Sequence, residues 1–226
     1  MPYVLGALAL LALLFGPMAY YVRWVMAWHG KDRADIPGTG AELARHMLDS
    51  EGLPNVAVEP ADGGDHYDPE ARAVRLSPEN FDGRSVTALA VAAHEVGHAL
   101  QHRDGSALFA LRLRLAKALV TLDRTAAVVL VAAPLVAAVT RAPGLVAMQV
   151  AAGLGLVGFS FLAQLVTLPL EWDASYRRAL PALRAGYLAG GDVGRARSVL
   201  RAAAMTYVAS ALFSVLNLAR AARLFR

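Results

Sequence analysis

Apolar residues of this chain gather in long blocks that alternate with segments of ordinary polarity. The first block, Pro2 to Val22, carries no charged side chain and is long enough to cross a bilayer core of about 30 Å as a helix. Thr125 to Thr140 and Leu145 to Leu170 are apolar again, and the turn sequence Arg141-Ala142-Pro143-Gly144 separates them. A last block, Ala202 to Ala219, has the length of a fourth span but contains Thr, Ser and Asn side chains. The pattern predicts a bundle of transmembrane helices.

The segment between the first block and the hairpin has the composition of a soluble domain. Thr39-Gly40-Ala41-Glu42 is a capping-box sequence that predicts the start of a helix, and Gly52 predicts its end. Alternating apolar residues predict short strands around Val56-Ala57-Val58 and at Ala73 to Ser77. Asp68-Pro69-Glu70, between them, is typical of a turn. We therefore expect a small α+β domain here.

A longer helix is predicted after the strands. Ser85 can cap it, and the helix runs from Val86 to about His102. Its apolar stretch of roughly fifteen residues is short for a membrane span, so we place it in a domain near the membrane. Leu108 to Arg124 then predicts an amphipathic cationic helix that lies at the interface and leads into the hairpin. In the return span, Ala151, Gly155 and Gly158 have the spacing of close helix packing, which permits a homo-oligomer without requiring one.

Composition supports a membrane protein. The hydrophobic fraction is 57%, above the usual range for a soluble domain. There is no cysteine, which excludes disulfides and thiolate metal sites. The net charge of +4 comes mostly from Arg beside apolar blocks, which favours contact with anionic lipid. The sequence has no aromatic and basic motif for nucleic acid, so we expect no nucleic-acid partner.

The positive charges also predict an orientation. The uncharged N-terminus is followed by Arg23, Lys31 and Arg33, so the positive-inside rule places the soluble domain in the cytoplasm of a multi-pass protein of the cell membrane. A fourth full span would put Arg220 and Arg223 outside, against the same rule. Whether the last block crosses the membrane therefore stays open.

The pentad His94-Glu95-Val96-Gly97-His98 lies on the predicted long helix. Residues four apart share one helix face, so His94 and His98 can bind one tetrahedral zinc, with Glu95 beside the open coordination position as general base. The alternative is a core helix with two incidental histidines. Two imidazoles and an acid would interrupt an otherwise apolar face, which favours the metal site.

A catalytic zinc needs a third protein ligand. Without cysteine, the candidates are the other imidazoles and the downstream acids, namely His29, His46, His66, His102, Glu171 and Asp173. His102 lies about 12 Å along the helix axis from His94, so the two cannot share the ion with His98. Glu171 follows the return span directly, and two crossings bring it back to the membrane side of His98. We expect Glu171 as the ligand, with Asp173 as the alternative or as the acceptor of a ligating imidazole N–H.

Together these features predict a mainly α integral membrane protein, a helical transmembrane bundle with a small α+β zincin-like catalytic domain. The expected parts are an N-terminal transmembrane anchor (1–22), a membrane-proximal catalytic domain (23–124), a transmembrane hairpin (125–170), a helical segment that supplies the third ligand (171–201), and a fourth apolar helix with a basic tail (202–226).

Several motifs resemble the bacterial YugP-like neutral zinc metallopeptidases, and the resemblance covers nearly the whole chain. The matching motifs are Thr39-Gly40-Ala41-Glu42, Asp65-His66-Tyr67-Asp68-Pro69, Val74-Arg75-Leu76-Ser77, Val91 to Ala99, Glu171-Trp172-Asp173-Ala174-Ser175 and Ala203 to Ala209. The resemblance implies a membrane-bound, zinc-dependent peptidase with His94 and His98 as ligands and Glu95 as catalytic residue. In the related HtpX and CAAX-prenyl proteases a glutamate is the third ligand and an aspartate follows it by four positions, where this chain has Ser175.

The expected reaction is hydrolysis of peptide bonds in membrane-associated or membrane-proximal polypeptides, with one zinc ion per chain. Glu95 would take a proton from the attacking water. Candidate donors to the oxyanion are His66, Tyr67 and Tyr176, and the strand at Val74 to Leu76 is a candidate edge for binding an extended substrate.

Two other readings remain. A non-enzymatic membrane scaffold or adaptor with a structural zinc would have a closed site of four ligands. An intramembrane protease would have its metal helix in the bilayer and an aspartate ligand in a later span, for which Leu122-Asp123-Arg124 is a poor match.

Overall fold

The computed structural model describes Pro17 and residues 20–205. Most of the predicted N-terminal anchor, most of the fourth apolar block and the basic tail lie outside the described residues. The chain divides into two compact units. We call Tyr20–Ala110 with Leu168–Thr206 the mixed unit, and Leu111–Thr167, grouped with both chain ends, the helical unit.

The mixed unit begins with a helix at residues 20–29, followed by α2, Gly40–Ser50. The predicted capping box opens α2. The Thr39 hydroxyl accepts from the Glu42 amide at 3.2 Å, and the Glu42 carboxylate accepts from the Thr39 amide at 2.8 Å. Gly52 follows the helix with φ of +72°, a conformation that glycine adopts without a steric penalty. Both predicted ends of this helix are confirmed.

Three short strands form the sheet: β1, Ala57–Pro60; β2, His66–Asp68; and β3, Ala73–Leu76. The order is β1-β3-β2, with β3 parallel to β1 and antiparallel to β2. The strands near Val58 and at Ala73 were predicted, whereas β2 was not. The expected edge at Val74 to Leu76 is wrong, because β3 is the central strand and its backbone pairs on both sides. The open edges belong to β1 and β2.

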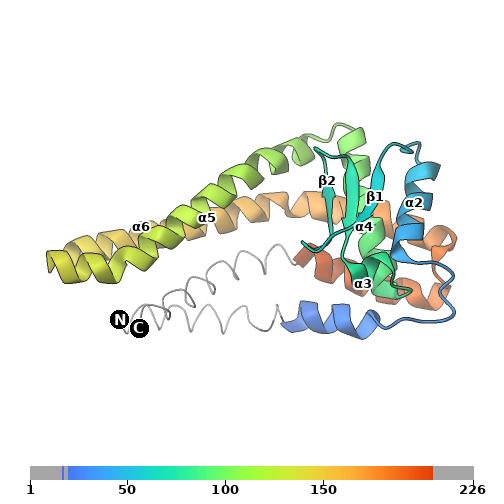
Figure 1. The fold of residues 1–226 in the computed structure, drawn as a ribbon, viewed down its shortest axis with the longest axis horizontal. Helices are drawn as coiled ribbons and strands as arrows, with labels where there is room; N and C mark the ends of the chain where they lie inside the picture. The colour runs from blue at the N-terminus through green and yellow to red at the C-terminus, as the bar shows by residue number, and fades with distance from the viewer. Residues whose placement is uncertain (1–16, 18–19, 206–226) are drawn as a thin grey trace. The chain divides into compact units, whose positions relative to one another are not determined.

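The helix α4, Val86–Arg103, is the centre of the mixed unit (Figure 1). The Ser85 hydroxyl accepts from the Ala88 amide at 3.0 Å, as the predicted cap requires. Every residue of α4 from Val86 to Gln101 is buried. It contacts α2, the short helix α3 (Pro78–Phe81), β2 and β3, so the pentad lies in the core of the unit.

A second stretch of chain completes the mixed unit. The end of the long helix α6 continues into the π-helical segment η1, Asp173–Ala179, the single turn α7, Leu180–Ala182, and a second π-helical segment η2, Leu183–Tyr187. A short 3-10 turn, η3, Gly190–Asp192, precedes a last helix at residues 193–205. Apolar side chains from this stretch join those of α2, α4 and the helix at 20–29 in one core.

Asp192 ties this second stretch to the first. Its buried carboxylate accepts from Arg33 at 2.8 Å and from Arg195 at 2.7 Å. The hydrogen bond from Arg33, and then the charges of both guanidinium groups, outweigh the effect of burial and hold the pKa of Asp192 below its usual value. The interaction therefore stabilises the fold at pH values above the ordinary aspartate pKa of about 4. This stabilisation is lost as the pH falls through the lower pKa that Asp192 has in the folded state.

We expect Asp192→Asn to lower the free energy of unfolding at neutral pH by about 1–2 kcal/mol, since two arginines lose their shared acceptor. Unfolding of the detergent-solubilised protein, followed at neutral and acid pH, measures this. Asp62→Asn, in an exposed loop, is the matched control. An unchanged midpoint for Asp192→Asn at neutral pH would contradict the assignment.

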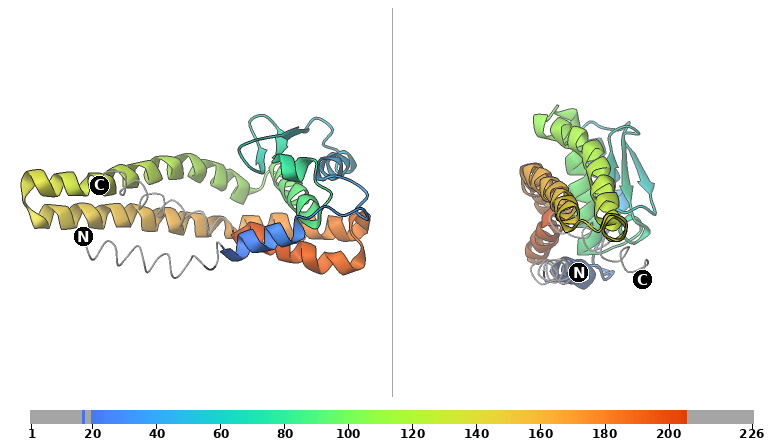
Figure 2. Two further views of the ribbon diagram at one scale, coloured as in Figure 1. Left: turned by 60° about the horizontal axis from the view of Figure 1, so that its bottom comes forward. Right: turned by 90° about the vertical axis from the view of Figure 1, so that its left-hand side faces the viewer.

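The helical unit consists of most of two long helices, α5, Ala107–Thr140, and α6, Pro143–Trp172. The first turn of α5 and the residues of α6 after Thr167 belong to the mixed unit. The two helices run antiparallel and side by side (Figure 2). Gln149 donates to the Val129 carbonyl at 2.7 Å, and a Cβ on Gly153 would meet Leu130 at 2.5 Å. Close packing therefore occurs at Gly153.

Two features of this unit differ from the predictions or extend them. At the predicted packing positions Gly155 and Gly158, a Cβ would meet no atom of the described residues within 4 Å, because they lie on another side of α6 from Gly153. The predicted interfacial helix and the following apolar segment form one continuous helix, α5. Among the described residues, α5 is the one helix long and apolar enough to cross a membrane, and the multi-span bundle stays a prediction.

Candidate metal centre

The helix α4 presents His94 and His98 on one face. Both imidazoles are buried, and their ring centroids lie 4.7 Å apart. The four-residue spacing and the helical backbone produce this arrangement without help from the rest of the chain. Glu95 is also buried, on the side of α4 that faces β2.

Glu171, in the last turn of α6, brings a carboxylate to the two imidazoles. Its Oε2 lies 3.2 Å from Nε2 of His94 and 3.3 Å from Nε2 of His98, and its side chain is 0% exposed. Ligands about 2.0–2.1 Å from a tetrahedral zinc ion lie roughly 3.3–3.4 Å from one another. The two distances from the carboxylate thus fit zinc, all three donors lie within 4.8 Å of one another, and their number leaves one coordination position for water.

Gly97 allows the helix that carries Glu171 to approach α4. A Cβ at this position would lie 2.9 Å from the carbonyl oxygen of Ala174 and 3.2 Å from its Cα. Such contacts with backbone atoms cannot be relieved by a rotamer change. The π-helical segment η1 begins two residues after Glu171, and π-helical turns are frequent at functional sites. The absence of a side chain at Gly97 therefore lets the segment that carries Glu171 pack closely against α4.

Each imidazole is oriented through its other ring nitrogen. Nδ1 of His94 lies 3.0 Å from Oγ of Ser175, and Nδ1 of His98 lies 2.9 Å from Oε1 of Gln101. The Gln101 amide nitrogen donates to the Leu170 carbonyl and to Asp173, at 2.9 and 2.8 Å. These two acceptors fix the amide so that its oxygen faces His98. Nδ1 of His98 must then carry the proton, which leaves the Nε2 lone pair for a metal.

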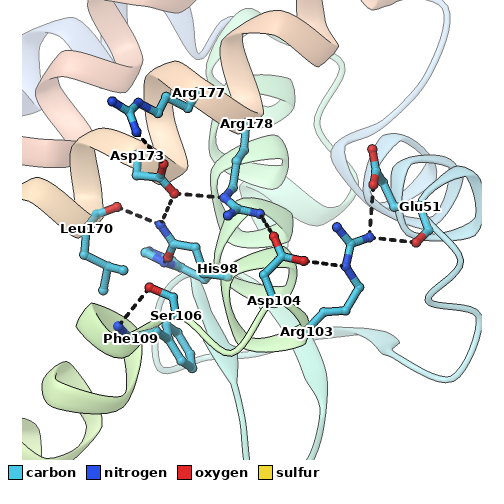
Figure 3. A network of polar contacts seen from close by, with 11 residues as sticks. Glu51, His98, Arg103, Asp104, Ser106, Phe109, Leu170, Asp173, Arg177 and Arg178 are labelled. Atoms are coloured by element: carbon cyan, nitrogen blue, oxygen red, sulfur yellow. Dashed lines mark hydrogen bonds and ion pairs between the residues drawn. The ribbon is translucent and has the colours of Figure 1, made fainter.

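A chain of charged side chains extends from Asp173 to Glu51 (Figure 3). Asp173 accepts from Arg178 at 2.9 Å, and Arg178 donates to Asp104 at 2.7 Å. Asp104 also accepts from Arg103 at 2.9 Å, and Arg103 donates to the Glu51 side chain at 3.1 Å. Burial alone would raise the pKa of Asp173, but the hydrogen bonds from Gln101 and Arg178 outweigh it and hold that pKa below its usual value. Asp173 is therefore a charged acceptor that holds Gln101 in place.

We expect Gln101→Leu to lower the zinc affinity by about 10–100-fold, because His98 loses the acceptor that sets its tautomer. Competition for zinc with a chromophoric chelator measures the affinity. Gln149→Leu removes a half-buried amide from the helical unit and serves as the control, with unchanged zinc affinity. Wild-type affinity in Gln101→Leu would show that the hydrogen bond to His98 does not orient a ligand.

Glu95 is held by the backbone of β2. Its Oε2 accepts from the Tyr67 amide at 2.9 Å. The Tyr67 phenol lies 3.0 Å from Nδ1 of His102, whose ring stacks on Phe109 at 5.3 Å between centroids. His102 therefore packs with Tyr67 and Phe109 beside the site. It is not one of the three grouped donors, as the helix spacing predicts.

The remaining predicted site residues have the following places. Asp173 accepts from Gln101, and Gln101 in turn contacts His98, so Asp173 acts on that imidazole indirectly. The side chain that contacts Nδ1 of His94 is Ser175. Nδ1 of His66 lies 2.9 Å from the Gly64 carbonyl. Tyr176 contacts the Trp172 ring, at 4.4 Å between centroids, and packs against the core. The roles of His66, Tyr67 and Tyr176 toward an oxyanion stay predictions.

Sequence reasoning missed the roles of Gln101 and Ser175. Gln101 follows His98 by three residues, so its place on the same helix face was a readable signal. Ser175 follows Glu171 by four residues, and its hydroxyl lies 3.0 Å from Nδ1 of His94.

Comparisons with known proteins agree with this geometry. Residues 3–226 match the model of a family described as "Putative neutral zinc metallopeptidase". The chain is 38% identical over 201 residues to "Putative membrane protease YugP" of Bacillus subtilis (strain 168), which covers 87% of this chain and 85% of that protein. No solved structure matches the chain significantly. The resemblance noted from the motifs is confirmed, and the chain belongs to this family of neutral zinc metallopeptidases.

Proposed function

We propose that the protein is a membrane-bound, zinc-dependent endopeptidase that cleaves membrane-associated or membrane-proximal polypeptides. The observation that carries the proposal is the buried group of His94, His98 and Glu171 with Glu95 on the same helix. A purely structural zinc site has no need of a buried carboxylate beside the ligands. The family and the relative from Bacillus subtilis support a protease.

His94, His98 and Glu171 would hold one zinc ion per chain. Bound zinc would lower the pKa of a coordinated water toward neutrality and polarise the substrate carbonyl. Ser175 and Gln101 orient the two imidazoles, and the close packing at Gly97 positions Glu171.

Glu95 is the general base in this proposal. The Tyr67 amide holds Oε2, so Oε1 is the atom that takes a proton from the attacking water and returns it to the leaving amine. His66, Tyr67 and Tyr176 remain the proposed sources of a hydrogen bond to the oxyanion. The Tyr67 phenol already contacts His102. His66 contacts the Gly64 carbonyl through Nδ1, and Nε2 takes no part in that contact, so His66 is the first of the three to test.

The proposed location is the cell membrane, with several spans and the mixed unit in the cytoplasm. Support comes from the apolar helix α5, the name of the relative and the distribution of Arg and Lys. The proposed partners are the lipid bilayer and a peptide or membrane-protein substrate.

Metal removal tests the proposal. We expect a chelator to abolish cleavage of a peptide tethered to the membrane in reconstituted vesicles, and about one equivalent of zinc per chain to restore it. A protein that binds zinc tightly but cleaves neither tethered nor free peptides, with or without added zinc, would instead be the scaffold of the alternative reading.

A further inference from the structure

The three tryptophans of the chain are all exposed on the mixed unit. Trp24 is 47% exposed, Trp28 61% and Trp172 53%. Tryptophan is on average a well-buried residue, and it is enriched where one end of the ring meets an apolar phase and the other meets water. Three exposed tryptophans and no buried one therefore point to a partner that is absent from the described protein.

The helix at residues 20–29 carries large aromatic side chains on its outer face. Val22 and Val25 face the core, while Tyr20, Trp24 and Trp28 lie on the outer side. The rings of Trp24 and Trp28 stack with 5.5 Å between centroids, and Tyr20 is 72% exposed. A helix that packs one face on a core normally presents polar residues to water on the other. We call Tyr20, Trp24 and Trp28 the first aromatic patch.

Trp172 forms the second aromatic patch together with Tyr176, whose ring it contacts. Each patch stands at the end of an apolar block of the sequence, Pro2 to Val22 for the first and Leu145 to Leu170 for the second. Aromatic residues at the ends of apolar helices are typical of the membrane–water interface. The side chain of Arg177, five residues after Trp172, lies 4.0 Å from Asp173 and is 83% exposed, which suits contact with anionic headgroups.

We propose that the two aromatic patches bind the headgroup region of an anionic phospholipid bilayer and hold the mixed unit against the membrane surface. The proposal deepens the proposed function and rests on its membrane location. It commits to lipid because each patch stands at the end of an apolar block long enough to cross a bilayer, which a protein partner would not require.

The second patch sets the height of the metal centre. Glu171 and Trp172 are adjacent on one helix, with the Glu171 side chain 0% exposed and turned toward the imidazoles, and the Trp172 side chain turned outward. A tryptophan at headgroup level therefore places the ligand one residue from the interface. The substrate class that follows is a polypeptide anchored in the same membrane, cleaved in the few residues that emerge from the bilayer.

Intrinsic fluorescence tests the proposal directly, because replacing two of the three tryptophans leaves one to report on a single patch. The full chain is reconstituted into vesicles of phosphatidylcholine and phosphatidylglycerol that carry a nitroxide either near the headgroup or near the end of the acyl chain. The double variants Trp28→Phe/Trp172→Phe and Trp24→Phe/Trp28→Phe leave Trp24 or Trp172 as the sole emitter. We expect the shallow nitroxide to quench each emitter about twofold more than the deep one.

Three results would overturn the proposal. Quenching by aqueous acrylamide but by neither nitroxide would place the tryptophans in water. Stronger quenching by the deep nitroxide would make them part of a span. If no quencher reaches the tryptophans, and this protection changes with the ratio of protein to lipid, the patches bind a second copy of the chain. Each measurement is repeated in Glu95→Gln, so it does not depend on turnover. A wild-type protein that binds zinc but cleaves no peptide, and whose tryptophans show shallow quenching, would reject the proposed peptidase and keep this surface.

Discussion

Replacing Glu95 with glutamine is expected to abolish peptide hydrolysis while zinc stays bound. Glu95 is not part of the group of three donors formed by His94, His98 and Glu171. Its Oε2 accepts from the Tyr67 amide. Glutamine keeps the size of the side chain but cannot take a proton from water. We expect kcat/KM to fall roughly 10²–10⁴-fold, which corresponds to about 3–5 kcal/mol of lost transition-state stabilisation.

The measurement pairs a cleavage assay on a membrane-tethered peptide with metal analysis of the same preparation. Glu79→Gln, in an exposed turn of α3, makes the same chemical change away from the site and should leave both readouts unchanged. Full activity in Glu95→Gln would remove Glu95 from the mechanism. Loss of zinc together with activity would assign it a role in metal binding.

Glu171→Gln is expected to lose the metal itself. The amide is a poor zinc ligand, and the Glu171 carboxylate is the group within 3.3 Å of both imidazole Nε2 atoms. Positioning residues around zinc contribute about 10–100-fold to affinity, so a direct ligand should contribute more than about 100-fold. Activity should fall with zinc occupancy and return in part when zinc is in excess.

Asp173→Asn is the matched comparison for this variant. Asp173 acts through Gln101, so the loss of its charge should reduce zinc affinity by about tenfold or less. Zinc competition on both variants separates the two acids. Wild-type zinc binding in Glu171→Gln together with a large loss in Asp173→Asn would move the third ligand to Asp173.

Local chemistry made a large part of the fold predictable. The Thr39 capping box, the Ser85 cap and the turn at Asp68 depend on hydrogen bonds within a few residues, and the structure contains all three. The shared face of His94 and His98 follows from helix geometry alone. Glu171 was a long-range expectation, reached by counting crossings of the membrane, and the structure brings it to the imidazoles.

Features that depend on tertiary packing were not predictable. The strand β2 contains only His66, Tyr67 and Asp68, and its pairing with β3 decides its conformation. The central place of β3 in the sheet has the same origin. Gly153 and Gly155 look equivalent in the sequence, and only the rotation of α6 against α5 makes Gly153 the contact. The orientation of the Gln101 amide required the positions of Leu170 and Asp173, far along the chain.

The mixed unit is assembled from two stretches of chain, with residues 111–167 between them. His94 and His98 belong to the first stretch and Glu171 to the second, so a shared zinc ion would act as a cross-link that closes a long loop. Closing such a loop restricts the unfolded ensemble, as a disulfide does, and this chain has no cysteine to serve that purpose. Zinc supply during biogenesis would then govern how long a newly inserted chain resists degradation, apart from any effect on catalysis.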